Sequence, residues 1–127
     1  MKFKHAVDMD KGIVIVKAVG NLSVIDILYE IQRAIISKRG KGIPRRIIDL
    51  SEDTYDYSED DVKLIFDKMR VSANILKTEQ IAFIIKEYPS DYDVHKIADL
   101  YRTERLDIGV FTCSADALCF LNQYKAG

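Results

Sequence analysis

The run Ile81-Ala82-Phe83-Ile84-Ile85 is unbroken by any polar residue and is bounded by Gln80 and Lys86. It has the length of a strand and not of a helix. A strand without alternating polar positions is typical of one that is covered on both faces of a sheet. The run therefore predicts a buried strand of an α/β domain.

The segment before this run predicts another strand and a helix. Residues Arg45–Leu50 are entered through Pro44 and are expected to be a strand. A helix is expected to begin at Ser58, with Asp61 three residues later in its negatively charged first turn. Its buried face is marked by apolar residues at helical spacing: Val62, Ile65, Phe66, Met69 and Ala73.

The N-terminal part predicts a hairpin followed by a helix. Residues 3–7 and 13–19 are rich in β-forming residues and are separated by the polar turn Asp8–Gly12. Ser23 and Asp26 have the spacing of a capping box at a helix start. The apolar stripe of this first helix comprises Val24, Ile27, Leu28, Ile31 and Ile35.

The C-terminal part predicts a helix, a strand and a last helix. Pro89-Ser90-Asp91 precedes a helix that carries Val94, Ile97, Ala98 and Tyr101. Residues 108–112 are expected to be a strand, and Ser114 to cap a short helix with Ala117, Leu118 and Leu121 inward. The order β-β-α-β-α-β-α-β-α predicts one α/β domain over residues 1–127. Its sheet is expected to be mostly parallel, with the hairpin as an antiparallel edge.

Composition excludes several classes of partner. The chain has 127 residues and a net charge of -1, so no overall field attracts nucleic acid or a membrane surface. No apolar stretch approaches the ~18 residues of a membrane span. Residues 1–8 lack the apolar segment of a signal peptide, so a cytoplasmic location is expected. Cys113 and Cys119 are expected to be half-buried free thiols.

Several short motifs resemble the STAS domain, the fold of anti-sigma-factor antagonists such as SpoIIAA. Residues 47–51 (Ile-Ile-Asp-Leu-Ser) and 56–59 (Asp-Tyr-Ser-Glu) are similar to the family's strand with its D-L-S turn and to its D-S-S-G helix start. Residues 81–85, 96–101, 110–111 and 117–121 resemble the SpoIIAA-like, or STAS/SEC14-like, group of small bacterial proteins. The resemblance covers about the whole chain and implies a SpoIIAA-like fold.

This resemblance makes Ser58 a candidate phosphosite, because it aligns with the serine that is phosphorylated in the antagonists. The chain departs from the motif, with Tyr57 in place of the first serine and Glu59 in place of the glycine. The carboxylates of Glu59, Asp60 and Asp61 would repel a phosphate. The alternative is that Ser58 serves only as a helix N-cap.

No catalytic motif is found, so we expect no enzyme, no cofactor and no metal site. The glycines are scattered, and the acidic residues between Glu52 and Asp61 lack the spacing of a calcium loop. They are expected to form a solvated loop and a helix start. His95 is expected to face solvent, and Cys113 to be an inert thiol. A small enzyme that uses either residue is a third option after the two binding functions below.

Ligands of parallel α/β domains tend to bind beyond the carboxyl ends of the strands. The expected loops there contain four tyrosines that could line a pocket or an interface. The candidate binding residues are Tyr55, Tyr57, Ser58, Tyr88, Tyr92 and Cys113. If the strands wind in one direction only, as the resemblance implies, this rule is weaker. A second candidate surface is the basic set Lys38, Arg39, Lys41, Arg45 and Arg46, either a site for an acidic partner or lipid head group or simply a helix end and loop.

The first hypothesis is therefore a STAS-like binding or regulatory module that contacts a partner protein, or a small apolar or anionic ligand, through these loops. The alternative is a SEC14-like carrier of lipid or another apolar ligand. A homodimer is a further option if helices leave the second face of the sheet uncovered.

Overall fold

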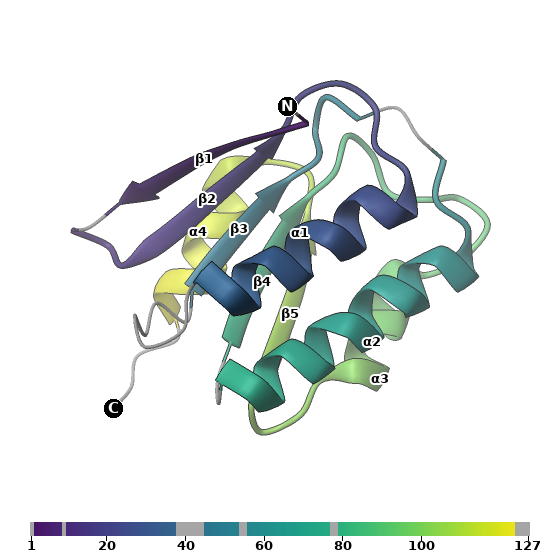
Figure 1. Ribbon diagram of the computed structural model, residues 1–127. Helices are drawn as coiled ribbons and strands as arrows, with labels where there is room; N and C mark the ends of the chain where they lie inside the picture. Colours follow the sequence, from purple (N-terminus) through teal and green to yellow (C-terminus); the bar gives the residue numbers. More distant parts are fainter. Residues whose placement is uncertain (1, 9, 38–44, 54–55, 77–78, 124–127) are drawn as a thin grey trace.

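Five strands lie side by side in a single sheet in the order β1-β2-β3-β4-β5 (Figure 1). The computed structural model describes residues 2–8, 10–37, 45–53, 56–76 and 79–123. The strands are β1 (Phe3–Asp8), β2 (Ile13–Ala18), β3 (Arg45–Asp49), β4 (Glu79–Ile84) and β5 (Leu106–Phe111). The β1–β2 pair is antiparallel and the other pairs are parallel. The predicted mostly parallel sheet with a hairpin edge is confirmed.

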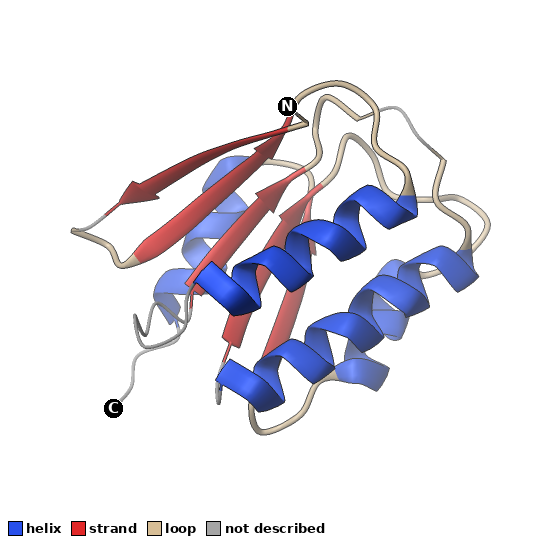
Figure 2. Cartoon of the chain, in the orientation of Figure 1, coloured by secondary structure: helices blue, strands red, loops and turns tan. Residues whose placement is uncertain are grey.

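Four helices cover the sheet on two sides (Figure 2). They are α1 (Val24–Ser37), α2 (Glu59–Leu76), α3 (Val94–Tyr101) and α4 (Ser114–Gln123). The first three lie on one face and α4 lies on the other (Figure 1). Because strand order follows chain order from β2 to β5, the parallel strands wind in one direction without a reversal.

The strand register places alternate residues of the sheet in two separate cores. Val16, Ile48, Phe83 and Val110 are aligned across four adjacent strands and all belong to the core beneath α1, α2 and α3. All five apolar residues predicted for the buried face of α2 are buried. The smaller core lies under α4 and contains Ile13, Ile47, Ala82, Ile84, Ala117 and Leu121. The run at 81–85 therefore supplies both cores alternately.

Both predicted capping boxes are present. The Ser23 backbone N–H donates to the Asp26 carboxylate, and the Asp26 N–H donates to the Ser23 hydroxyl. Ser58 and Asp61 form the same reciprocal pair at 3.0 and 3.1 Å. The hydrogen bonds at Ser23, together with Lys2, lower the pKa of Asp26. Each carboxylate satisfies a backbone donor that would otherwise lack a partner at the helix start.

Three local expectations are wrong. α4 begins at Ser114 itself, and its Ala117 N–H donates to the carbonyl of Cys113, so Ser114 does not precede the helix as a cap. β5 begins at Leu106, two residues earlier than expected, because Leu106 and Asp107 pair with β4. Cys113 and Cys119 are exposed, not half-buried.

The predicted basic surface set is also corrected. Arg46 is 2% exposed and its guanidinium donates to the carboxylate of Glu79 over 2.7 Å. It lies on the face of the sheet that holds the larger core, and so it cannot meet an external partner. Arg45 is partly buried, while Lys38, Arg39 and Lys41 lie outside the described residues.

The second face of the sheet carries only one helix in the described ranges. Beyond α4, the hairpin presents Lys4, Ala6 and Lys17, which are exposed. The homodimer stays a prediction, and this polar surface offers little apolar area for one. In the same described part of the chain, no helix combines the length and apolar character needed to cross a membrane.

Candidate functional site

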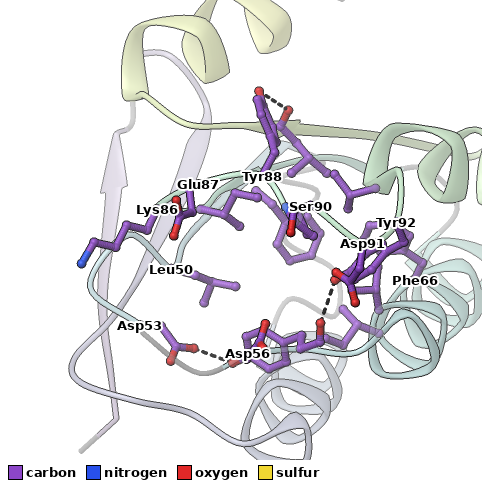
Figure 3. Close-up of a pocket in the computed structure, with 18 residues that line it drawn as sticks. Leu50, Asp53, Asp56, Phe66, Lys86, Glu87, Tyr88, Ser90, Asp91 and Tyr92 are labelled. Atoms are coloured by element: carbon purple, nitrogen blue, oxygen red, sulfur yellow. Dashed lines mark hydrogen bonds between the residues drawn. The ribbon is translucent and has the colours of Figure 1, made fainter.

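A pocket of about 760 Å³ lies beyond the carboxyl ends of β3, β4 and β5 (Figure 3). One wall is the loop between β3 and α2, and the other is the loop between β4 and α3. The volume lies within the range of pockets that hold small organic ligands. The strands do not reverse direction here, so the hollow results from the separation of these two loops and not from a topological switch point.

The floor of the pocket is apolar because it continues the larger core. It is formed by the end of β3, the first turns of α2 and the inward residues of β4 and β5. Leu50 lies toward the centre of the view in Figure 3. The aromatic rings of Phe66 and Phe83 pack together in this lining, with their centroids 5.7 Å apart. The remaining apolar lining consists of Val62, Ile65, Ile85, Pro89, Val94 and Val110.

Tyr57 anchors one wall of the pocket. Its hydroxyl lies 2.9 Å from the backbone carbonyl of Leu22 and also contacts the Asp53 carboxylate, so its single proton faces two acceptors. Asp53 is 6% exposed and accepts a hydrogen bond from the Leu22 N–H. The loop after β2 is thereby joined to the loop after β3.

Tyr92 joins the second wall to the first. Its hydroxyl donates to the backbone carbonyl of Tyr57 over 2.8 Å. Burial and, after it, the carboxylates of Asp91, Asp56, Asp61 and Glu59 together raise the pKa of Tyr92 to about 12. Tyr92 therefore keeps its proton at neutral pH and remains a donor.

Tyr88 closes the β5 side of the pocket. Its hydroxyl donates to the carbonyl of Val110 over 3.3 Å, and its ring packs edge-on against His95 at 4.8 Å. Although both side chains are exposed, this contact holds them at the start of α3. The expectation that His95 faces solvent is confirmed.

The structure brings together part of the predicted site. Tyr57, Tyr88 and Tyr92 line the pocket. Tyr55 lies outside the described residues. Ser58 is exposed one position beyond the lining, and Cys113 is exposed between β5 and α4 and does not line the pocket.

Sequence reasoning missed the polar residues of the rim. These are Asp53, Asp56, Lys86, Glu87, Ser90 and Asp91. The expectation of a fully solvated acidic loop is wrong for Asp53, which is buried because it bonds to the Leu22 N–H and to Tyr57. The signal that could have found the others is their position next to the strand ends. In the described ranges, no His, Cys, Asp or Glu side chains form a group of three able to hold a metal ion.

No protein-family model matches the chain, and no curated protein matches it either. The resemblance to STAS domains therefore rests on the motifs and on the element order alone.

Proposed function

We propose that this chain is a binding or regulatory module with a STAS-like fold, and that the pocket beyond β3–β5 holds a small apolar ligand. The observation that carries the proposal is the combination of a cavity of about 760 Å³ with a floor drawn from the hydrophobic core. Burying apolar ligand surface on such a floor contributes about 25 cal/mol per Å² of area removed from water.

Hydrogen bonds hold the loops at the pocket in place. This favours a preformed ligand-binding site over a gap left by poor packing. Tyr57 and Tyr92 connect its walls through hydrogen bonds to the backbone. A cavity held open in this way costs a ligand little ordering of the loops. The order of elements and the one-directional winding of the strands support the STAS resemblance.

The proposal is tested with 1-naphthylmethanol, a neutral apolar probe. The chain contains no tryptophan, so naphthalene emission can be followed without an indole background. We expect saturable binding, with amide chemical-shift changes concentrated at Leu50, Phe83 and Val110. Shifts spread over the surface, or none at all, would contradict the proposal.

A pair of matched variants locates the binding. Leu50→Trp places a bulkier side chain in the pocket and is expected to weaken naphthylmethanol binding about tenfold or more, measured in both variants by chemical shifts because the new indole overlaps the naphthalene emission. Leu100→Trp introduces the same residue on α3, where Leu100 is 73% exposed and outside the lining, and should bind like the parent. Circular dichroism checks that both variants are folded. If Leu50→Trp is not, the shift map of the parent protein decides.

A further inference from the structure

The rim of the pocket is negatively charged. Its lining includes the carboxylates of Asp53, Asp56, Glu87 and Asp91 against one ammonium group, that of Lys86. Lys86 extends away from the centre of the pocket (Figure 3). Within the described part of the chain, Asp56, Glu87 and Asp91 form no ion pair, so no cation neutralises their negative charges.

The raised pKa of Tyr92 reflects the same negative charge around the pocket. After burial, the causes that raise its pKa are all carboxylates, beginning with Asp91 and Asp56. A phenolate at this position would be repelled by them. A ligand anion in the same place would meet the same repulsion, whereas a cation would be attracted.

Several of the backbone N–H groups that usually attract anions already have acceptors. α2 and α3 both begin beside the pocket, and helix N-termini commonly bind anions through free N–H groups. At α2 the Asp61 N–H donates to the Ser58 hydroxyl. At α3 the N–H groups of His95 and Lys96 both donate to the Asp93 carboxylate. These caps offset the positive ends of the two helix dipoles.

We propose that the pocket selects an amphipathic cation, an apolar molecule that carries a protonated amine. The apolar body lies on the floor formed by Leu50, Phe83 and Val110, and the ammonium group lies at the rim near Asp56 and Asp91. The inference rests on the proposed function and specifies the class of its ligand. The anionic ligand that the sequence admitted is disfavoured by these charges.

Three probes with the same ring and different charges test the inference at pH 7. They are 1-naphthylmethylamine, which is cationic, 1-naphthylmethanol, which is neutral, and the carboxylate of 1-naphthylacetic acid (the acetate), which is anionic. We expect the amine to bind about tenfold more tightly than the alcohol, which corresponds to about 1.4 kcal/mol, and the acetate to bind most weakly. Because exposed charges are screened by salt, the advantage of the amine should shrink between low and high ionic strength.

Two double variants with equal charge changes locate the selectivity. Asp56→Asn/Asp91→Asn removes two carboxylates from the rim and should bring the amine to the affinity of the alcohol. Asp10→Asn/Glu104→Gln removes two exposed carboxylates from turns at the opposite edge of the sheet and should keep the preference. The alcohol should bind both variants and the parent equally.

The outcomes separate the two proposals. Equal binding of amine and alcohol to the parent, or tightest binding of the acetate, overturns the cation inference and leaves the apolar pocket in place. The inference also fails if both double variants lose the preference equally, since the overall charge would then be its cause. Failure of all three probes to bind overturns the proposed function itself.

Discussion

The hydroxyl of Tyr92 donates a 2.8 Å hydrogen bond to the backbone carbonyl of Tyr57 across the pocket. Tyr57 in turn places its own hydroxyl between Asp53 and the carbonyl of Leu22. These contacts link the loops that follow β2, β3 and β4 into one continuous network. Two tyrosine hydroxyls thus set the spacing of three neighbouring loops at the carboxyl edge of the sheet.

Tyr92→Phe should destabilise the protein by removing one partly buried hydrogen bond. We expect the free energy of unfolding in urea to fall by about 1 kcal/mol. Tyr29→Phe is the matched control, because Tyr29 is 73% exposed on α1 and its hydroxyl makes no hydrogen bond to the described residues. Its effect should stay within about 0.5 kcal/mol. Equal losses in the two variants would mean that the bond across the pocket contributes nothing specific.

The ionisation of Tyr92 predicts a loss of stability at alkaline pH. Its pKa is raised to about 12 in the folded protein, while an unfolded tyrosine ionises near pH 10. Between these values the native state binds more protons than the unfolded state, so the free energy of unfolding falls as pH rises. Below about pH 10 both states are protonated and this contribution does not change with pH.

A stopped-flow pH jump that follows phenolate absorbance checks the assignment on the folded protein before it unfolds. The chain has seven tyrosines. Tyr92→Phe should remove one phenolate from the part of the titration nearest pH 12 and leave the earlier part unchanged. If the lost phenolate belongs to the step near pH 10, the predicted shift is wrong.

The fold was predictable because its signals are local. The capping pairs Ser23/Asp26 and Ser58/Asp61 each span one helical turn, so the sequence places the starts of α1 and α2 directly. The apolar run at 81–85 indicates a strand covered on both sides from its own residues. β5 was placed less well, because Leu106 and Asp107 become strand only through pairing with β4, which no local pattern reveals.

The site was predictable only in part because its contacts are distant in sequence. The strand-end rule brought Tyr57, Tyr88 and Tyr92 together. The same rule could not show that Asp53 would be buried, since its partner Leu22 lies 31 positions away. For Arg46 the error is the reverse, since its basic neighbours predicted a surface position although the side chain is buried. Its partner Glu79 lies 33 positions away, so no local pattern indicates the ion pair.

Ser58→Ala should destabilise α2 by about 1 kcal/mol, because the Asp61 N–H loses its acceptor at the start of the helix. Ser58→Asp should restore most of this stability, because aspartate is also a good N-cap. Thermal unfolding compares the three proteins. An equal loss in both variants would show that the serine hydroxyl does more than cap the helix.

The phosphosite remains a separate prediction for the exposed Ser58. Incubation with a cognate kinase followed by mass spectrometry should place the phosphate on Ser58, and Ser58→Ala should abolish it. A phosphate on another residue, or on none, would reject the prediction and leave the capping role unchanged.

Arg46 and Glu79 form a buried ion pair between β3 and β4, and the Ser72 hydroxyl from α2 donates to the same carboxylate over 2.7 Å. Both charged side chains are at most 2% exposed. The guanidinium is imperfectly satisfied, because its Nε is buried and has no hydrogen-bond partner among the described residues. Such a pair costs much desolvation, and its net contribution to stability is therefore small.

Removing one partner of this pair should lower the free energy of unfolding far more than removing both partners. We expect Arg46→Met or Glu79→Leu alone to lower the free energy of unfolding by about 3–5 kcal/mol, because each leaves an uncompensated buried charge. The double variant should lose much less than the sum, since neither charge remains. Urea unfolding of the four proteins gives the coupling energy.

Should a single variant not fold, Glu79→Gln keeps the size and a hydrogen-bond acceptor while it removes the charge. Additive losses would contradict the buried pair, because two side chains that do not interact lose stability independently.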